Sequence, residues 1–182
     1  MQELSMNVLD VAENSVAAGA KLVTIDLVFD EVAGTLRLVI ADDGKGMDAE
    51  LAARVTDPFC TSRTSRKVGL GLPFLKMAAE LTGGWMSLES QPGKGTTVTA
   101  LFYPDHIDMP PLGDMAATVA GLVQCNPAME LCFTLSTAAG RFSADTREMR
   151  PLLGEVSFAE PQVALWLREY LDENIREIMK KE

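Results

Sequence analysis

Apolar residues recur at two spacings along this chain, and each spacing predicts one type of element. Residues 4–18 carry apolar side chains at three- and four-residue steps, which is typical of an amphipathic helix. Residues 21–29 and 35–41 instead alternate apolar and polar positions and are rich in β-branched residues. The polar turn at 30–34 ends in glycine, so these two segments are predicted to form a hairpin.

Both patterns continue as far as residue 104. A short helical stretch is predicted at 49–55, and a helix that begins with the glycines at 69–72 is predicted to run to about Leu81. Two more strand-like segments, 85–90 and 96–103, flank a glycine-rich turn and predict a second hairpin.

A smaller C-terminal unit is predicted for residues 114–182, after a proline-rich linker at 105–113. We expect it to be a helix–strand–strand–helix annex that serves as a partner-binding or accessory region. Its elements are expected at 114–124, 129–136, 140–145 and 161–180.

The last predicted helix, 161–180, is strongly amphipathic. Its apolar stripe consists of Val163, Trp166, Leu167, Tyr170, Leu171, Ile175 and Ile178. We favour packing of this stripe on the sheet of its own unit. The alternative is a docking face for a client protein or for a second copy of the chain in a homodimer.

Four short motifs follow one another in the first unit. They are residues 10–15 (DVAENS), 43–47 (DGKGM), 69–72 (GLGL) and 93–97 (GKGTT). Each motif alone is weak evidence, because short glycine patterns recur by chance. Four of them in this order, each on a suitable predicted element, indicate a pocket for ATP.

Polar groups of the first two motifs are placed to face a ligand. Asp10 and Asn14 lie four residues apart and therefore share one helical face, where a solvated stripe is the alternative interpretation. Asp43 follows the second strand and adjoins Gly44 and Gly46. An acid beside two glycines lets backbone approach a ligand closely, whereas the simpler interpretation is a plain turn.

Residues 61–67 (TSRTSRK) hold three cations and four hydroxyls within a long irregular connection. Such a connection is either a functional lid or a solvated loop. Cations and hydroxyls are groups that a lid over a polyphosphate would offer. The glycines that follow open a helix, whose N-terminal N–H groups and dipole favour phosphate, and this position favours the lid.

Together these residues resemble the GHKL superfamily, which includes the ATP-binding domains of gyrase, the ninety-kilodalton heat-shock chaperone, sensor histidine kinases and the mismatch-repair MutL proteins. Residues 13–20 (ENSVAAGA) are similar to the MutL form of the N box, whereas 57–59, 69–75 and 93–97 look more like a histidine-kinase catalytic domain. The resemblance covers about residues 3–104. It implies an α/β (α+β) two-layer sandwich, in which a mixed sheet carries helices on one face.

The resemblance implies ATP and Mg²⁺ as cofactors. Asn14 would be the metal ligand, since Mg²⁺ keeps some waters and takes few protein oxygens. The residues expected at the phosphates are Gly69, Gly71 and Leu72 through their backbone, and either Lys67 or Arg66 through its charge.

The resemblance also assigns the residues around the base. Asp43 would accept a hydrogen bond from the exocyclic amine of adenine, and Thr96 would support this contact through a water. Gly44 and Gly46 would let the backbone pass under the base, and Met47 would line its pocket.

The sequence departs from sensor histidine kinases at the phosphoacceptor. Those kinases carry a histidine on a dimerisation helix before this domain, but here the helix at 4–18 is nearly the first element. The only histidine, His106, lies in a proline-flanked connector, where we expect a structural or exposed role. These departures disfavour a complete sensor kinase.

Superfamily members that hydrolyse ATP or phosphorylate serine carry an acid four residues before the N-box asparagine, where it acts as general base. Asp10 takes that position, so the resemblance implies a catalytic role for Asp10. We expect an ATP-hydrolysing regulatory switch. The alternatives are a protein kinase that acts in trans on serine, threonine or histidine, and a module that senses ATP without turnover.

Composition narrows the possible partners. The net charge is −10, from 26 acids and 16 bases, and this excess disfavours nucleic acid as a partner. No run of 18 apolar residues occurs, so we expect no membrane span. The three cysteines, Cys60, Cys125 and Cys132, fit no zinc spacing and suggest reduced thiols in a cytoplasmic protein.

Overall fold

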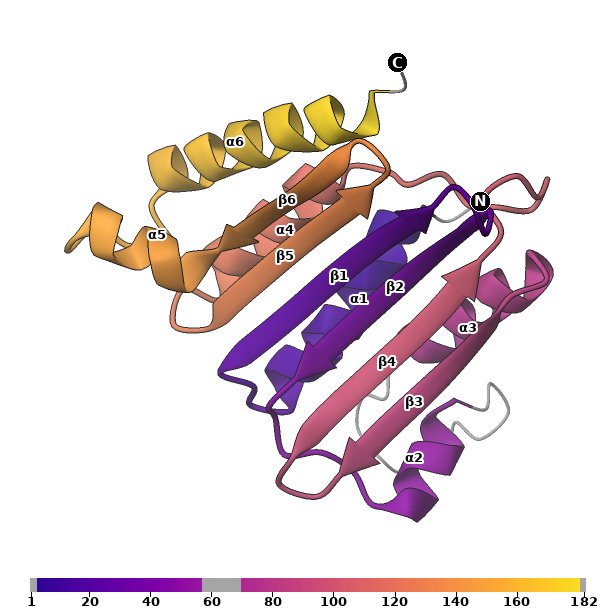
Figure 1. Ribbon diagram of the computed structural model, residues 1–182. Helices are drawn as coiled ribbons and strands as arrows, with labels where there is room; N and C mark the ends of the chain where they lie inside the picture. The colour runs from indigo at the N-terminus through magenta and orange to yellow at the C-terminus, as the bar shows by residue number, and fades with distance from the viewer. Residues whose placement is uncertain (1–2, 57–69, 181–182) are drawn as a thin grey trace.

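A computed structural model describes residues 3–56 and 70–180 of the chain. One six-stranded sheet, in the order β3-β4-β2-β1-β5-β6, forms its centre, and α1, α3 and α4 lie on one face of it (Figure 1). The elements are α1 (Leu4–Ala17), β1 (Leu22–Asp30), β2 (Thr35–Asp42), α2 (Ala49–Val55), α3 (Gly71–Leu81), β3 (Trp85–Gln91), β4 (Gly95–Phe102), α4 (Met115–Cys125), β5 (Glu130–Thr137), β6 (Gly140–Asp145), α5 (Thr146–Leu153) and α6 (Pro161–Met179).

The predicted fold class is confirmed, since the sheet is mixed and carries helices on one face. Every predicted helix and strand is present within two residues of its expected limits. One helix, α5, was not predicted. It is short and contains Pro151, a residue that interrupts helices, so its pattern did not indicate one.

Strand β5 joins the C-terminal region to the rest of the fold. It pairs in parallel with β1, from Leu22 opposite Glu130 to Val28 opposite Ser136. Figure 1 shows β1 in indigo directly beside β5 in orange. The predicted annex therefore adds its two strands to the sheet of the first 104 residues.

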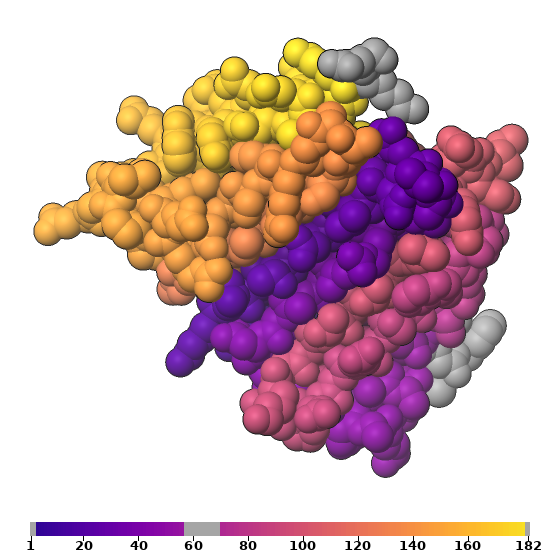
Figure 2. Space-filling model, viewed as in Figure 1, coloured from indigo at the N-terminus to yellow at the C-terminus, as the bar shows by residue number. Residues whose placement is uncertain are grey.

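The two faces of the sheet differ in chemistry. Helix-facing positions such as Ile25, Leu38 and Phe133 are buried and apolar. Their neighbours along the strands, among them Thr24 and Thr99, are only half-buried. In Figure 2 the strands themselves form the surface on this side. The alternation of period two thus places the core between sheet and helices.

Helix α6 packs on α4 and on the outer strands β5 and β6. Val163, Leu167 and Leu171 of its apolar stripe are buried. The Tyr170 ring meets Phe142 edge-on at 5.6 Å between ring centroids, and the Trp166 ring stacks on Tyr170 at 5.7 Å. The buried residues of the stripe therefore pack within the molecule, as favoured from the sequence, whereas Trp166 remains 44% exposed. In the part of the chain that is described, no helix is long and apolar enough to cross a membrane.

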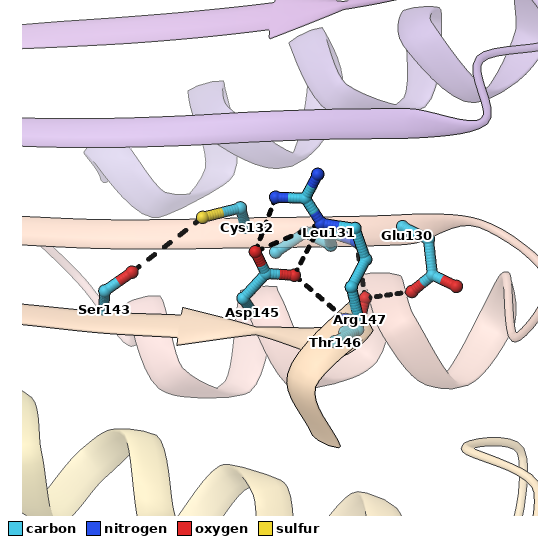
Figure 3. Close-up of polar contacts among 7 residues, drawn as sticks. All are labelled: Glu130, Leu131, Cys132, Ser143, Asp145, Thr146 and Arg147. Atoms are coloured by element: carbon cyan, nitrogen blue, oxygen red, sulfur yellow. Dashed lines mark hydrogen bonds and ion pairs between the residues drawn. The ribbon is translucent and has the colours of Figure 1, made fainter. Parts of the chain in front are cut away.

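Helix α5 is hydrogen-bonded to the start of β5 through buried Thr146. Its hydroxyl accepts a hydrogen bond from the Leu131 N–H at 2.8 Å and donates to Glu130 at 2.5 Å (Figure 3). The Arg150 guanidinium donates to Glu130 at 2.7 Å from the other side. Burial alone would raise the pKa of Glu130, but the hydrogen bonds from Arg150 and Thr146 outweigh it and hold the pKa below its usual value.

Replacing Thr146 tests this attachment. Thr146→Val keeps the size of the side chain but leaves the Leu131 N–H without its partner, so the free energy of unfolding should fall by about 1–3 kcal/mol. Urea unfolding followed by circular dichroism measures it. The matched control is Thr99→Val on the open face of the sheet, where a change within about 0.5 kcal/mol is expected. Equal effects of the two substitutions would contradict the attachment.

Candidate functional site

A cavity of about 490 Å³ opens between α1, the ends of β2 and β4, and α2. Five of the residues expected at the site line it, namely Asn14, Gly46, Met47, Leu72 and Thr96. Its apolar walls include Ile40 and Val98. Residues far apart in sequence thus meet in one pocket of a size that suits a small ligand.

The acid in this cavity is Asp42, at the end of β2, and not Asp43. Asp42 lines the cavity, with one carboxylate oxygen accepting from the Ser15 hydroxyl at 2.7 Å and the other from the Gly44 N–H at 2.8 Å. Asp43 is absent from the lining. Its carboxylate accepts instead from the backbone N–H groups of Lys21 and Leu22, at 2.7 and 2.9 Å.

These backbone contacts explain the electrostatics of Asp43. The N–H of Leu22 makes the largest contribution in lowering the pKa of Asp43, and the N–H of Lys21 adds to it, although burial acts in the opposite direction. Asp43 therefore serves the fold, because it ties the segment after β2 to the start of β1. The spacing D-x-G-x-G, counted back from Gly44 and Gly46, begins at Asp42, and this was the signal available in the sequence.

The glycines let the turn after β2 pass between two other parts of the chain. A Cβ on Gly44 would lie 2.9 Å from the Cβ of Ala18, so α1 ends directly against the turn. The Lys45 N–H also donates to the Ala18 carbonyl at 3.0 Å. Gly46 has φ +65°, and a Cβ there would overlap the Gln91 carbonyl oxygen. Neither glycine tolerates a side chain without moving the wall of the cavity.

Ser90 joins this turn to the hairpin of β3 and β4. Its hydroxyl accepts from the Met47 N–H at 2.8 Å and lies 2.9 Å from the hydroxyl of Thr96. Thr96 pairs with Asp42 across β4 and β2, so the two face the cavity as neighbours. Sequence reasoning expected Thr96 beside the acid and missed Ser90, which belongs to none of the four motifs.

Asn14 lines the cavity and carries a buried polar group without a partner in the described part of the chain. Its amide nitrogen is buried and has no hydrogen-bond partner among the described residues. Burying an amide without a partner is costly, so a polar ligand beside it would be favoured. This fits the expectation of Mg²⁺ and phosphate next to Asn14, since the amide offers one oxygen for a metal and one N–H₂ group for an anion.

Asp10 lies where α1 meets the beginning of α3. A Cβ placed on Gly71 would come within 2.6 Å of the Asp10 Cβ, so only glycine permits this approach. The first N–H groups of α3 therefore lie near a carboxylate one helical turn from Asn14. Lys67 and Gly69, which were expected at the phosphates, lie outside the described residues.

Sequence comparison agrees with this geometry. The profile of the family described as "Histidine kinase-, DNA gyrase B-, and HSP90-like ATPase" matches residues 1–106. The chain belongs to this family. Membership in the histidine kinase-, gyrase B- and HSP90-like ATPases confirms the resemblance inferred from the four motifs and identifies the chain as an ATP-binding domain of the histidine-kinase-like type.

Two curated relatives come from Caulobacter vibrioides. Sensor protein DivL is 42% identical over 66 residues, which make up 36% of this chain and 8% of DivL. Histidine protein kinase DivJ is 39% identical over 70 residues, or 36% of this chain and 12% of DivJ. The chain thus matches only a small part of the length of either relative.

A solved structure, described as the N-terminal domain of a DNA repair protein, shares the fold with a TM-score of 0.56 and 14% identity. It covers 80% of this chain and 52% of its own chain. Because 80% of 182 residues exceeds the 106 matched by the family profile, the structural likeness extends into the C-terminal region of this ATPase-family chain.

The two neighbouring aspartates can be separated experimentally. Asp42→Asn should weaken ATP binding about tenfold or more, because the cavity loses a charged acceptor, while Asp43→Ala should change affinity little. Isothermal titration calorimetry measures both. Asp43→Ala should instead lower the free energy of unfolding by about 1 kcal/mol.

The stability effect of Asp43→Ala should depend on pH in one direction. A lowered folded-state pKa stabilises the fold above the unfolded value of about 3.9, and this contribution disappears as the pH falls through the folded pKa. The difference in the free energy of unfolding between Asp43→Ala and the wild type should therefore be largest at neutral pH and become smaller below about pH 4. The assignment of Asp42 as the acid that faces the ligand would be contradicted by the opposite result in calorimetry. In that result Asp43→Ala loses ATP affinity and Asp42→Asn keeps the affinity of the wild type.

Proposed function

We propose that this chain binds Mg-ATP in the cavity between α1 and the glycine turn and hydrolyses the nucleotide as a regulatory switch. The observation that carries the proposal is the convergence of Asn14, Asp42 and Thr96 on one cavity, with the amide of Asn14 left without a partner among the described residues. Family membership supports ATP as the nucleotide.

At the base end, Asp42 would take the role first expected of Asp43. Its carboxylate would accept a hydrogen bond from the exocyclic amine of adenine, and Thr96 would support that contact. The apolar walls and the side chain of Met47 would cover the faces of the base. Gly46 would keep this wall in place, because only glycine lets the turn lie against the Gln91 carbonyl.

At the phosphate end, Asn14 would coordinate Mg²⁺, which supplies charge neutralisation when bound. Gly71 and Leu72 begin α3, and their backbone N–H groups would donate to the phosphates. A lid cation, Lys67 or Arg66, would add a positive charge. Binding of the nucleotide would thereby involve both α1 and α3.

Asp10 would act as general base in hydrolysis. A water oxygen would bond to the γ-phosphorus while the bond from that phosphorus to the β,γ-bridging oxygen breaks, and Asp10 would accept the proton that the water loses. The support is positional, because Asp10 lies against Gly71 and one turn from Asn14. A change of nucleotide state would then alter the surface offered to a client protein.

Phosphotransfer in trans is the second candidate function. The similarity to DivL and DivJ, a sensor protein and a histidine protein kinase, favours it. The same carboxylate of Asp10 could deprotonate a serine or threonine hydroxyl of a client. Sensing of ATP without turnover is the third candidate.

Single-turnover incubation with γ-labelled ATP and Mg²⁺, alone and with cell extract, tests these functions. Free phosphate without labelled protein is the result expected for the switch. A labelled band that needs extract would indicate a kinase, and acid stability of the label separates serine from histidine. If neither free phosphate nor labelled protein forms although calorimetry shows ATP binding, turnover is refuted and the chain is a module that senses ATP.

Two substitutions on α1 test the residue roles. Asn14→Ala should abolish Mg-dependent ATP binding, whereas Asp10→Asn should preserve binding and reduce turnover by about 10²- to 10⁴-fold. The matched control for Asn14 is Asn174→Ala on α6, which should leave affinity unchanged. Unchanged Mg-ATP affinity in Asn14→Ala would overturn the site, and full turnover in Asp10→Asn would leave Asp10 a structural residue.

A further inference from the structure

Ser15 is a buried hydroxyl at the cavity that none of the roles above uses. It follows Asn14 on α1 and is only 3% exposed. Its side chain lines the cavity, and its hydroxyl donates to one oxygen of Asp42 at 2.7 Å. Adjacent residues of one helix therefore reach the two ends of the proposed nucleotide site.

The second oxygen of Asp42 is held as well. It accepts from the Gly44 N–H at 2.8 Å, within a turn that is fastened to the end of α1 by the bond from Lys45 to Ala18. A carboxylate that accepts one donor on each oxygen cannot rotate about its terminal bond without losing both hydrogen bonds. The plane of the Asp42 carboxylate is thus set jointly by Ser15 and Gly44.

The direction of the Ser15 hydrogen bond determines what the wall offers to a ligand. A serine hydroxyl has one proton, and here the carboxylate takes it. Ser15 and Asp42 therefore present only acceptor lone pairs to the cavity. A ligand edge with an N–H₂ group is favoured at this wall, and a carbonyl oxygen in the same place faces unpaired acceptors.

We propose that Ser15 is a positioning and specificity-determining residue, which orients Asp42 so that the cavity selects purines with a 6-amino group over purines with a 6-oxo group. This inference rests on the proposed binding of ATP, and it adds the origin of base selection. Ser15 acts through Asp42, so its effect is confined to ligands that carry the amine.

The test compares three nucleotides in calorimetric titrations of the full chain. ATP has the 6-amino group, purine riboside triphosphate has hydrogen at that position, and inosine triphosphate has an oxygen. Ser15→Ala should weaken ATP binding roughly fivefold to thirtyfold, yet change the affinity for purine riboside triphosphate less than about twofold. The preference for ATP over inosine triphosphate should shrink by the same factor as ATP affinity.

Two further variants separate positioning from packing. Ser15→Thr retains a hydroxyl and should restore most of the ATP affinity. Ser5→Ala removes another buried hydroxyl of α1, 2% exposed and remote from the cavity lining, and should leave all three affinities unchanged. Urea unfolding of each variant confirms that the compared proteins are folded.

The outcomes are distinguishable. Equal losses for ATP and purine riboside triphosphate in Ser15→Ala would reduce Ser15 to a packing residue and overturn the inference while ATP binding stands. Equal wild-type affinities for ATP and inosine triphosphate would overturn it in the same way. Failure of the wild-type chain to bind any of the three would overturn the proposed function and this inference together.

Discussion

Side chains of a β-strand alternate between its faces, so Asp42, the last residue of β2, lies on the same face as buried Leu38 and Ile40, whereas Asp43 follows the strand. Asp42 turns inward to Ser15 and Gly44, and Asp43 turns outward to the backbone at the start of β1. One acid is thereby available to a ligand, and its neighbour fixes the strand end from which it projects. The rest of the site depends on this division, because the glycine turn begins at the same point.

The outward acid also connects the cavity to the C-terminal region. Asp43 holds the N–H groups of Lys21 and Leu22, and the Lys21 carbonyl accepts from the Glu130 N–H at 2.8 Å, where β5 begins. Glu130 in turn is held by Thr146 and Arg150 of α5. The strand that carries the C-terminal region is therefore aligned at the same end of the sheet as the cavity wall that holds Asp42.

Periodicity predicted most of the fold, because amphipathic helices and half-buried strands leave regular patterns in sequence. It could not predict that β5 would lie beside β1, since pairing between strands a hundred residues apart depends on complementary packing that no local pattern records. Helix α5 escaped for a local reason. It is only eight residues long and contains Pro151, a residue that interrupts helices, so the sequence did not indicate it.

The site was predictable to the level of motifs and not of individual atoms. Asn14, Met47 and Thr96 were expected and do line the cavity. Each belongs to a motif whose spacing can be recognised from the sequence alone. Choosing between Asp42 and Asp43 required knowing which way the strand end faces. No role was predicted for Ser15 and Ser90, because a single serine forms no recognisable sequence pattern. The role of each hydroxyl depends on the hydrogen-bond partners that the fold places beside it.

The two ends of the cavity differ in whether their polar groups already have hydrogen-bond partners. The proposed base end is built from groups that are already paired with one another, so its geometry exists before a ligand arrives and little ordering would be needed to bind. At the proposed phosphate end, the amide nitrogen of Asn14 has no partner among the described residues, and a polar ligand beside it would supply one. Under the proposed function, binding energy from the base would be available to organise the end where phosphoryl transfer is proposed. The proposed nucleotide-dependent switch would use this asymmetry, because a preformed base site could hold the nucleotide while the phosphate end responds to its state.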